Sequence, residues 1–196
     1  MPRKSAWCFG LGLVSMAVLC AAPLIEKQDR TWKLYTNAQW GYCVSYPSRW
    51  LKGDAFDGAG IYVKTGLKKY SKALGEIDVG VLPDEAEPVA RATPVSLVRH
   101  SLVEDLEMHF DGLKRFERAE SIEILEKREM QIVGSSALFT KDRYYDPQER
   151  ATWLEEIIFT HHNGALYRLE LECRDDQLPR FEPVFQTFVR TFRFGC

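Results

Sequence analysis

The chain has 196 residues, of which 45% are hydrophobic and 12% are aromatic, and its formal net charge at pH 7 is −2. A chain this rich in apolar and aromatic residues can bury a core, which excludes a disordered protein. Its 26 basic and 28 acidic residues are nearly balanced. This balance excludes nucleic acid as the main partner, because nucleic-acid-binding domains concentrate positive charge.

The first 25 residues have the pattern of an export leader. Arg3 and Lys4 precede 20 residues without a charge, 6–25, which is the order of regions in a secretory signal. The small residues of 20–22 suit a cleavage after residue 22, where Pro23 would follow the cut, and a cut after Ala21 is the alternative. We expect a leader at 1–22 and a domain at 31–196. An uncleaved anchor stays open, because about 20 apolar residues can span a bilayer, and so does a lipoprotein modified at Cys20. The expected location is periplasmic or extracellular, with membrane anchoring as the alternative.

The first half of the chain predicts short strands and one long helix. Strands are expected at 32–35, 41–47, 61–63 and 77–82, and residues 48–60 are expected to form a turn and a loop. Residues 84–94 are rich in acids and proline, which predicts a solvated loop. Apolar residues at three- and four-residue steps predict a helix that starts at Pro94 and ends near Leu113.

The second half predicts a meander of strands followed by a helix. Strands are expected from residue 120 onward, at 137–145, at 153–160 and at 165–173, and a helix is expected from Pro183 to Phe192. In 165–173 the apolar residues alternate with Arg168, Glu170 and Glu172, which predicts that these three face water. Strands in hairpin succession with helices beside them predict an α+β domain with an antiparallel sheet.

Three segments are similar to motifs of a known family. Residues 40–50, WGYCVSYPSRW, match an opening of the form aromatic–Pro–x–x–Trp. Residues 163–169 match a late Asn-Gly hairpin, and residues 185–194 match a closing Phe-rich helix end. With these segments the chain resembles the PsbP-like family over residues 31–194. The resemblance implies an αβα sandwich around an antiparallel sheet, and an accessory or binding role without a shared catalytic site.

Three cysteines, Cys43, Cys173 and Cys196, follow the leader. An exported chain can keep one disulfide among them, in any of three pairings, or all three can stay reduced. If a bridge forms, Cys43 with Cys196 is favoured, because the two ends of a domain often lie close together. Cys173 is expected to face the core.

The motifs of common catalytic sites are absent from the sequence. There is no dinucleotide fingerprint, phosphate loop, zinc-protease motif or nucleophile elbow. His100 and His109 are expected on opposite faces of the long helix, where they cannot share a metal ion. His161 and His162 are expected to be solvated at a hairpin turn. We therefore expect no metal centre, no catalytic residues and no cofactor.

Two groups of residues are candidates for an interaction. A basic stretch could meet an anionic headgroup or an acidic partner, and two tyrosines beside a turn could line a recognition loop. The alternatives are a solvated loop and ordinary packed tyrosines. The residues of the two groups are Lys64, Lys68, Lys69, Tyr70 and Lys72, and Tyr144 and Tyr145.

Together these features favour a non-enzymatic accessory or binding protein of the cell envelope over an enzyme. Its partner is expected to be an envelope protein or the membrane surface, and not nucleic acid. Two alternatives stay open. One is a membrane-anchored assembly factor, and the other is an enzyme whose site is assembled from residues distant in the sequence.

Overall fold

The computed structural model describes residues 31–55, 59–65, 74–83 and 100–196. In this part of the chain the strands form a three-stranded and a seven-stranded sheet, and every strand pair is antiparallel. The small sheet, in the order β1-β2-β10, contains β1 (Trp32–Asn37), β2 (Tyr42–Pro47) and β10 (Arg193–Phe194). The large sheet has the order β3-β4-β5-β9-β8-β7-β6. Its strands are β3 (Leu51–Ala55), β4 (Gly60–Lys64), β5 (Gly75–Pro83), β6 (Glu120–Ile132), β7 (Ser135–Asp146), β8 (Ala151–His162) and β9 (Ala165–Arg174).

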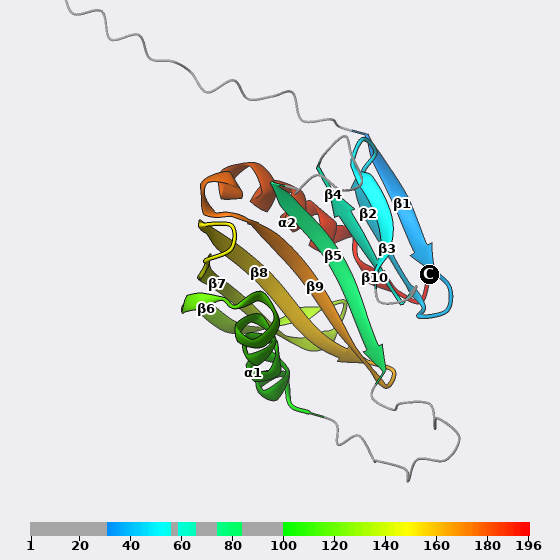
Figure 1. The fold of residues 1–196 in the computed structure, drawn as a ribbon. Helices are drawn as coiled ribbons and strands as arrows, with labels where there is room; N and C mark the ends of the chain where they lie inside the picture. The colour runs from blue at the N-terminus through cyan, green and yellow to red at the C-terminus, as the bar shows by residue number, and fades with distance from the viewer. Residues whose placement is uncertain (1–30, 56–58, 66–73, 84–99) are drawn as a thin grey trace, which may run out of the picture.

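Two helices cover opposite faces of the large sheet (Figure 1). Helix α1 (Leu102–Gly112) contacts β8 and β7 and continues into the short helix η2 (Leu113–Glu117). Helix α2 (Leu178–Thr191) follows the single turn η3 (Asp175–Gln177) and contacts β9 on one side and β2 of the small sheet on the other. The predicted αβα arrangement around an antiparallel sheet is therefore confirmed. We call the two faces of the large sheet the α1 face and the α2 face.

The main core lies on the α2 face. Period-two alternation points aliphatic side chains of β5 and β9 toward the phenylalanines of α2. Leu169, Leu171 and Phe188 are all fully buried there. The small sheet adds aromatic contacts, including the stack of Tyr42 on Phe192 with ring centroids 5.7 Å apart. The inward-facing residues of 165–173 were thus correctly predicted.

Three elements differ from the prediction. Helix α2 begins at Leu178, so Pro183 lies inside the helix and not in its first turn. Helix α1 begins at Leu102 and not at Pro94, because Ser101 and Glu104 form a capping box that fixes the helix start. Residues 94–99 lie outside the described residues. The loop expected over 48–60 contains strand β3, which pairs with β4. Gly53 permits this pairing, since a Cβ atom at that position would overlap the ring of Tyr62.

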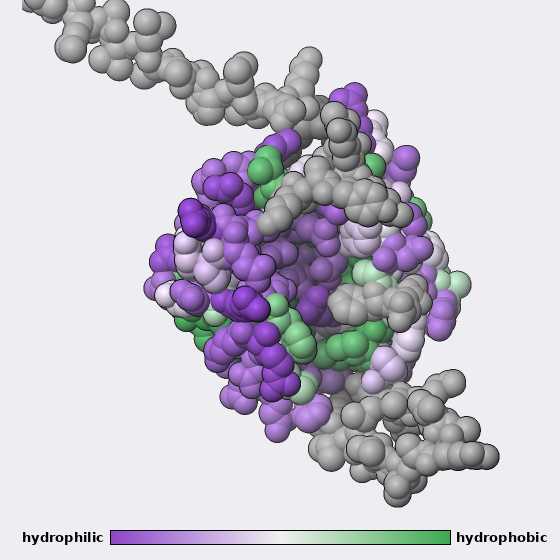
Figure 2. Space-filling model, viewed as in Figure 1, coloured by the Kyte–Doolittle hydropathy of each residue, from purple (hydrophilic) through white to green (hydrophobic). Residues whose placement is uncertain are grey.

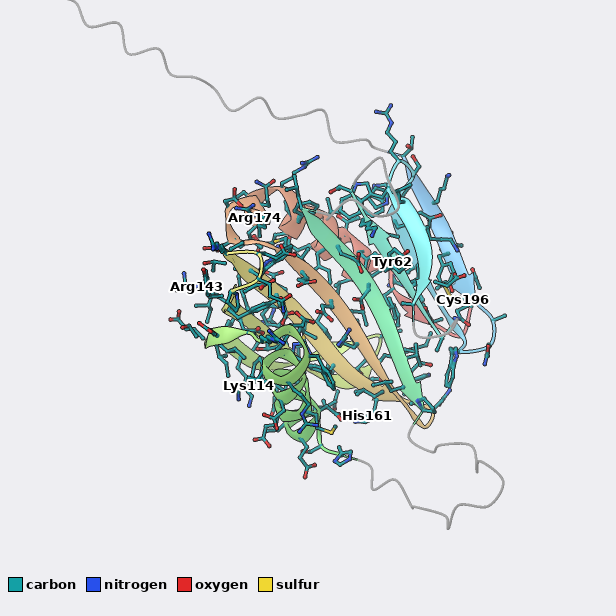
Figure 3. The ribbon with its side chains drawn as sticks, viewed as in Figure 1. Tyr62, Lys114, Arg143, His161, Arg174 and Cys196 are labelled. Carbon is teal, nitrogen blue, oxygen red and sulfur yellow. A yellow bond between two sulfur atoms is a disulfide. The ribbon has the colours of Figure 1, made fainter. Side chains whose placement is uncertain are left out.

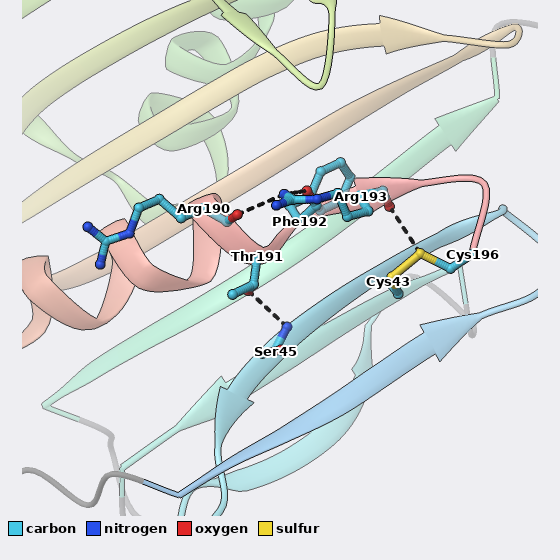
Figure 4. Close-up of a disulfide and its surroundings, with 7 residues drawn as sticks. All are labelled: Cys43, Ser45, Arg190, Thr191, Phe192, Arg193 and Cys196. Atoms are coloured by element: carbon cyan, nitrogen blue, oxygen red, sulfur yellow. Dashed lines mark hydrogen bonds between the residues drawn. A yellow bond between two sulfur atoms is a disulfide. The ribbon is translucent and has the colours of Figure 1, made fainter.

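A disulfide joins Cys43 of β2 to Cys196 at the end of the chain (Figure 4). The two Cα atoms are 5.9 Å apart across 153 residues of sequence. The backbone of Gly195, which has a positive φ of 73°, donates a hydrogen bond to the carbonyl of Gly41 at 2.7 Å and brings Cys196 back to β2. Cys173 is a free, fully buried thiol on the α2 face.

We expect one free thiol in the unreduced, denatured protein without its leader, and three after reduction. The reason is that Cys43 and Cys196 are bonded to each other, whereas Cys173 has no sulfur partner. Thiol titration with and without reductant measures both numbers. Three free thiols before reduction, or a mapped peptide that links Cys173 to another cysteine, would contradict this pairing.

Candidate functional site

Four carboxyl groups lie side by side across the α1 face of the large sheet. Strand pairing places Glu76 opposite Glu172, Glu172 opposite Glu155, and Glu155 opposite Asp142. We call these four residues the acidic row. Lys64 of β4 stands opposite Glu76 at one end of it. Adjacent strands are about 4.8 Å apart, so the acidic row extends for about 14 Å across β5, β9, β8 and β7.

A second pair of acidic residues lies next to the acidic row and has its own counter-ion. Asp78 stands opposite Glu170 on β5 and β9. Arg168, two residues from Glu170, places Nε 2.8 Å from Glu170 Oε2 and a terminal nitrogen 3.8 Å from Asp78 Oδ2. These contacts balance the second pair with the charge of Arg168. Arg168 also acts on the acidic row, where its charge lowers the pKa of Glu155 in part, and Lys64 has the same effect on Glu76.

Burial and mutual repulsion keep protons on the acidic row near neutral pH. Burial raises the pKa of Asp142 to about 7, while the neighbouring Glu155 and Thr140 lower it in part. Burial is the main cause that raises the pKa of Glu172 to about 8, and the negative charge of Glu170 is the second. The same two causes hold the pKa of Glu155 well above its usual range, and burial raises the pKa of Glu76. Like charges on directly opposite residues of neighbouring strands destabilise a sheet.

The acidic row makes hydrogen bonds to a tyrosine and to a histidine. The hydroxyl of Tyr144 donates a hydrogen bond to Glu172 at 2.7 Å and lies 3.2 Å from Glu117 of η2. His109 Nε2 of α1 is 2.9 Å from Glu155 Oε2. Burial lowers the pKa of His109 to about 4 and raises the pKa of Glu155, so it favours the uncharged form of both partners. In that form the pair shares one proton and carries no net charge.

Asp142 forms the closed end of the acidic row. Its side chain is 0% exposed, and hydrogen bonding with Glu155 and Thr140 lowers the pKa of its carboxyl group in part. The other end is less buried, since Glu76 is only partly buried. Figure 2 shows hydrophilic side chains in a hollow near the middle of this face, and Figure 3 shows Tyr62 and Lys114 on either side of it.

The protein should become less stable as the pH rises from 6.5 to 8.0. The folded-state pKa values of Asp142, about 7, and Glu172, about 8, exceed the unfolded values, so the folded state holds more protons. The stabilisation from these protons is complete when the pH is below the pKa values of the unfolded state. It is lost as the pH rises through the pKa values of the folded state. Each extra proton changes the free energy of unfolding by about 1.4 kcal/mol per pH unit, which predicts a loss of about 2 kcal/mol over this range.

Urea titrations at each pH measure this change. Burial lowers the pKa of His109 from 6.5 to about 4, so the unfolded state holds part of a proton near pH 6.5 that the folded state lacks. This raises the stability by about 0.4 kcal/mol over the same range and offsets only a small part of the effect of the acidic row. The other groups near the acidic row are Glu117 of η2, Lys64 of β4, Asp78 of β5 and Arg168 of β9. A stability that is constant or rises over this range would contradict the raised pKa values.

The predicted interaction residues do not form one surface. Lys64 lies at the end of the acidic row, with Nζ 5.3 Å from the centroid of the Tyr62 ring. Tyr144 is 2% exposed and bonds into the acidic row, whereas Tyr145 is 36% exposed. Consecutive strand residues point to opposite sides, so the two tyrosines cannot line one loop. The predicted residues Lys68, Lys69, Tyr70 and Lys72 lie outside the described part of the chain.

The expectation of solvated turn histidines is wrong. His161 Nε2 is 3.0 Å from Asp105 Oδ2 of α1. His162 stacks on Phe194, with ring centroids 3.8 Å apart. His100 precedes helix α1, so only His109 of the two predicted helix histidines is helical. The physical reason is that both faces of the β8–β9 hairpin are covered, one by α1 and the other by the chain terminus.

The expectation that Arg168, Glu170 and Glu172 face water is also wrong. Their alternation with the apolar residues was correctly predicted, but they point into the α1 face, and Glu170 is only 6% exposed. The sequence did contain a signal for the acidic row. Asp142, Glu155 and Glu172 each interrupt a predicted strand, and only the pairing register shows that they lie side by side.

The groups in the acidic row limit its chemistry. Among the described residues, no group of three or more His, Cys, Asp or Glu side chains could hold a metal ion. The acidic row also contains no serine or cysteine nucleophile. It offers negative charge, hydrogen-bond acceptors and exchangeable protons. In the described ranges no helix is long and apolar enough to cross a membrane.

Comparison with known proteins identifies the fold. No protein-family model and no curated protein matches the chain. The solution structure of cyanobacterial PsbP (CyanoP) from Synechocystis matches with a TM-score of 0.58 and 13% identity, covering 90% of this chain and 98% of that one. A Bacteroides thetaiotaomicron structure matches with a TM-score of 0.51 and 9% identity, covering 83% of this chain and 48% of that one. The chain therefore has the PsbP-like fold.

Proposed function

We propose that this protein is an exported, non-enzymatic accessory protein of the cell envelope, and that it binds its partner through the acidic row. The observation that carries the proposal is the pairing of Glu76, Glu172, Glu155 and Asp142 on neighbouring strands. Like charges in this arrangement oppose folding. A positively charged partner group would relieve this repulsion, so the chemistry of the acidic row favours a cationic partner.

The residues around the acidic row support binding over catalysis. The site lacks a nucleophile and a set of metal ligands among the described residues. Glu172 and Glu155 are already hydrogen-bonded by Tyr144 and His109. The leader at 1–22 supports export, since it has the charge and apolar pattern of a secretory signal. The PsbP-like fold is compatible with an accessory role.

An enzyme is the second candidate, and one observation favours it. The pKa of Asp142 is about 7 and that of Glu172 about 8, which are values suited to general acid–base catalysis near neutral pH. In this case a substrate would be converted in the open half of the hollow. The two candidates therefore differ in whether the bound molecule leaves unchanged.

Cross-linking in intact envelopes, followed by mass spectrometry, tests the proposed function. We expect the wild-type protein to capture a defined partner, and the E76Q/E172Q variant to lose it. The control is E120Q/E129Q, which removes the same charge from the exposed edge strand β6 and should capture the partner normally. Equal capture by all three proteins would contradict binding at the acidic row.

Incubation with envelope extract separates binding from catalysis. Retention of a component in a one-to-one ratio and with unchanged mass supports a binding protein. Consumption of a component over time, abolished in E76Q/E172Q, would instead assign an enzyme.

N-terminal sequencing of the native protein tests export. We expect a chain that starts near residue 23 and is recovered outside the cytoplasm. A chain that starts at residue 1 or 2 in the cytoplasm would contradict export. A membrane-bound chain that retains residues 1–22 would favour an anchored assembly factor.

A further inference from the structure

The charges of the protein are divided unevenly between its two sides. Residues 31–50 and 178–196 contain the small sheet and α2, and we call these two segments the basic side. Its only acidic residue is Glu182, which pairs with Lys141 of β7 at 3.6 Å. Its five basic residues are Lys33, Arg49, Arg180, Arg190 and Arg193. The other described residues include 12 basic and 21 acidic ones, so the basic side is a positively charged part of an otherwise acidic protein.

An exposed leucine lies on the outer side of the small sheet. Alternation along β1 points Tyr35 toward the core and Leu34 away from it, and Leu34 is 66% exposed. Trp32 points to the same side as Leu34 and is half-buried. Leu34 stands opposite Ser45 of β2, whose small side chain does not cover it. The outer side of the small sheet thus presents a large apolar side chain and part of an indole ring to solvent.

Basic residues lie on both sides of Leu34. Lys33 precedes it on β1 and is exposed. On the other side, β10 carries Arg193 and pairs with β2, so Arg193 lies two strand spacings, about 10 Å, from β1. The guanidinium group of Arg193 donates a hydrogen bond to the backbone carbonyl of Arg190 at 2.7 Å, which makes the two arginines neighbours beside β2 (Figure 4). An apolar side chain between cations can contact both phases of a membrane surface.

We propose that the outer side of the small sheet, together with the C-terminal end of α2, binds the surface of an anionic phospholipid membrane. Leu34 enters the boundary between headgroups and acyl chains, and the basic residues around it contact the lipid phosphates. A phospholipid surface offers an anionic group and an apolar phase together, whereas an acidic protein segment would leave Leu34 against polar groups. Only residues 26–31 separate this surface from the uncharged run 6–25, which brings the surface close to any membrane that the run enters.

This orientation leaves the acidic row accessible to a partner. The acidic row lies on the α1 face, whereas α2 and the small sheet pack on the opposite face of the large sheet (Figure 1). The negative potential of an anionic membrane attracts the basic side and repels the acidic one. The domain therefore binds with α1 pointing away from the membrane. The inference goes beyond the proposed function, because it concerns a second surface with a different partner.

Co-sedimentation with lipid vesicles tests the inference. The protein purified from the envelope is expected to bind vesicles of phosphatidylglycerol and phosphatidylcholine, and to bind them more weakly as salt is added. Vesicles of phosphatidylcholine alone measure any binding that does not depend on lipid charge. The K33Q/R190Q variant should bind the anionic vesicles about thirtyfold more weakly, since each basic residue near an anionic surface contributes roughly fivefold. The control is R115Q/K127Q, which removes the same charge from η2 and β6 and should bind like the wild type.

The contribution of the leucine is measured in the same way. L34S should bind the anionic vesicles more weakly by about fivefold or more, because serine gains little from entering the acyl-chain boundary. The matched control is F116S. Phe116 of η2 is 76% exposed and lies on the side of α1, so its replacement should leave vesicle binding unchanged. Circular dichroism should confirm that the variants fold, since all the replaced side chains are exposed or partly exposed.

Several outcomes would overturn the inference. Absence of binding to anionic vesicles would reject the membrane, and loss of a cross-linked envelope protein in K33Q/R190Q would then assign the surface to an acidic protein. Equal losses in K33Q/R190Q and R115Q/K127Q would mean attraction by the overall charge, and equal losses in L34S and F116S would place the contact elsewhere. E76Q/E172Q separates this inference from the proposed function, because it should lose its captured partner and keep its vesicle binding. Loss of vesicle binding in that variant would contradict the proposed orientation.

Discussion

The Arg168→Met variant should lose about 3 kcal/mol of unfolding free energy at pH 8, because it leaves two buried acidic groups without their counter-ion. Arg168 contacts both Glu170 and Asp78, whose side chains are 7% and 16% exposed. Methionine keeps much of the side-chain length but cannot donate hydrogen bonds. Denaturant titrations at pH 8 measure the loss.

The pH dependence and a rescue variant identify the cause of this loss. Burial is the main cause that holds the pKa of Asp78 well above its usual range, and the negative charge of Glu170 is the second. A lower pH favours the protonated form of Asp78, so the loss in Arg168→Met should be smaller at pH 5 than at pH 8. R168M/E170Q should recover part of the stability at pH 8. The control is Arg174→Met, which removes an exposed arginine 3.6 Å from Asp176 and should cost no more than about 0.5 kcal/mol.

A loss in Arg168→Met that does not change with pH would assign the effect to packing. In that case the aliphatic stem of Arg168 would be the stabilising part, and the balance of charge between the two acidic groups would not explain the α1 face. Recovery in R168M/E170Q would argue against this reading, because a glutamine at 170 restores no packing at position 168.

The sequence predicted the elements of the fold because their causes are local. Period-two alternation in 165–173 identifies Leu169 and Leu171 as core residues, and both are fully buried. Recurring apolar residues likewise predicted both helices. Even the error at Pro94 has a local cause, since the capping box at Ser101 and Glu104 determines where helix α1 begins.

The acidic row could not be predicted in the same way. Its members lie on β5, β7, β8 and β9, and they become neighbours only when the register of three strand pairs is known. Shifting one strand by a single residue would move its carboxyl to the other face of the sheet. The alternation in β9 also predicts that Glu170 and Glu172 face water, because polar residues that alternate with core residues along a strand usually do. Here that face is covered in part by α1, whose His109 contacts Glu155.

The Leu171→Ala variant should lose about 2–5 kcal/mol of unfolding free energy, and Leu169→Ala should lose a similar amount. Both side chains are 0% exposed and lie in the core between β9 and α2. Truncation to alanine removes buried methyl groups and leaves a cavity that the packed phenylalanines of α2 cannot fill without moving. Urea titrations monitored by fluorescence and circular dichroism measure both changes.

The control for these leucine variants must be chosen from the exposed edge of the sheet. Glu170 lies between the two leucines in sequence, but it contacts Arg168 and is only 6% exposed, so it does not behave as a surface residue. Glu129 on β6 is exposed, and Glu129→Ala should change the stability by no more than about 0.5 kcal/mol. Equal losses in all three variants would mean that β9 pairs in a different register. Both the α2 core and the acidic row would then be wrongly assigned, because the same alternation of β9 residues determines both faces.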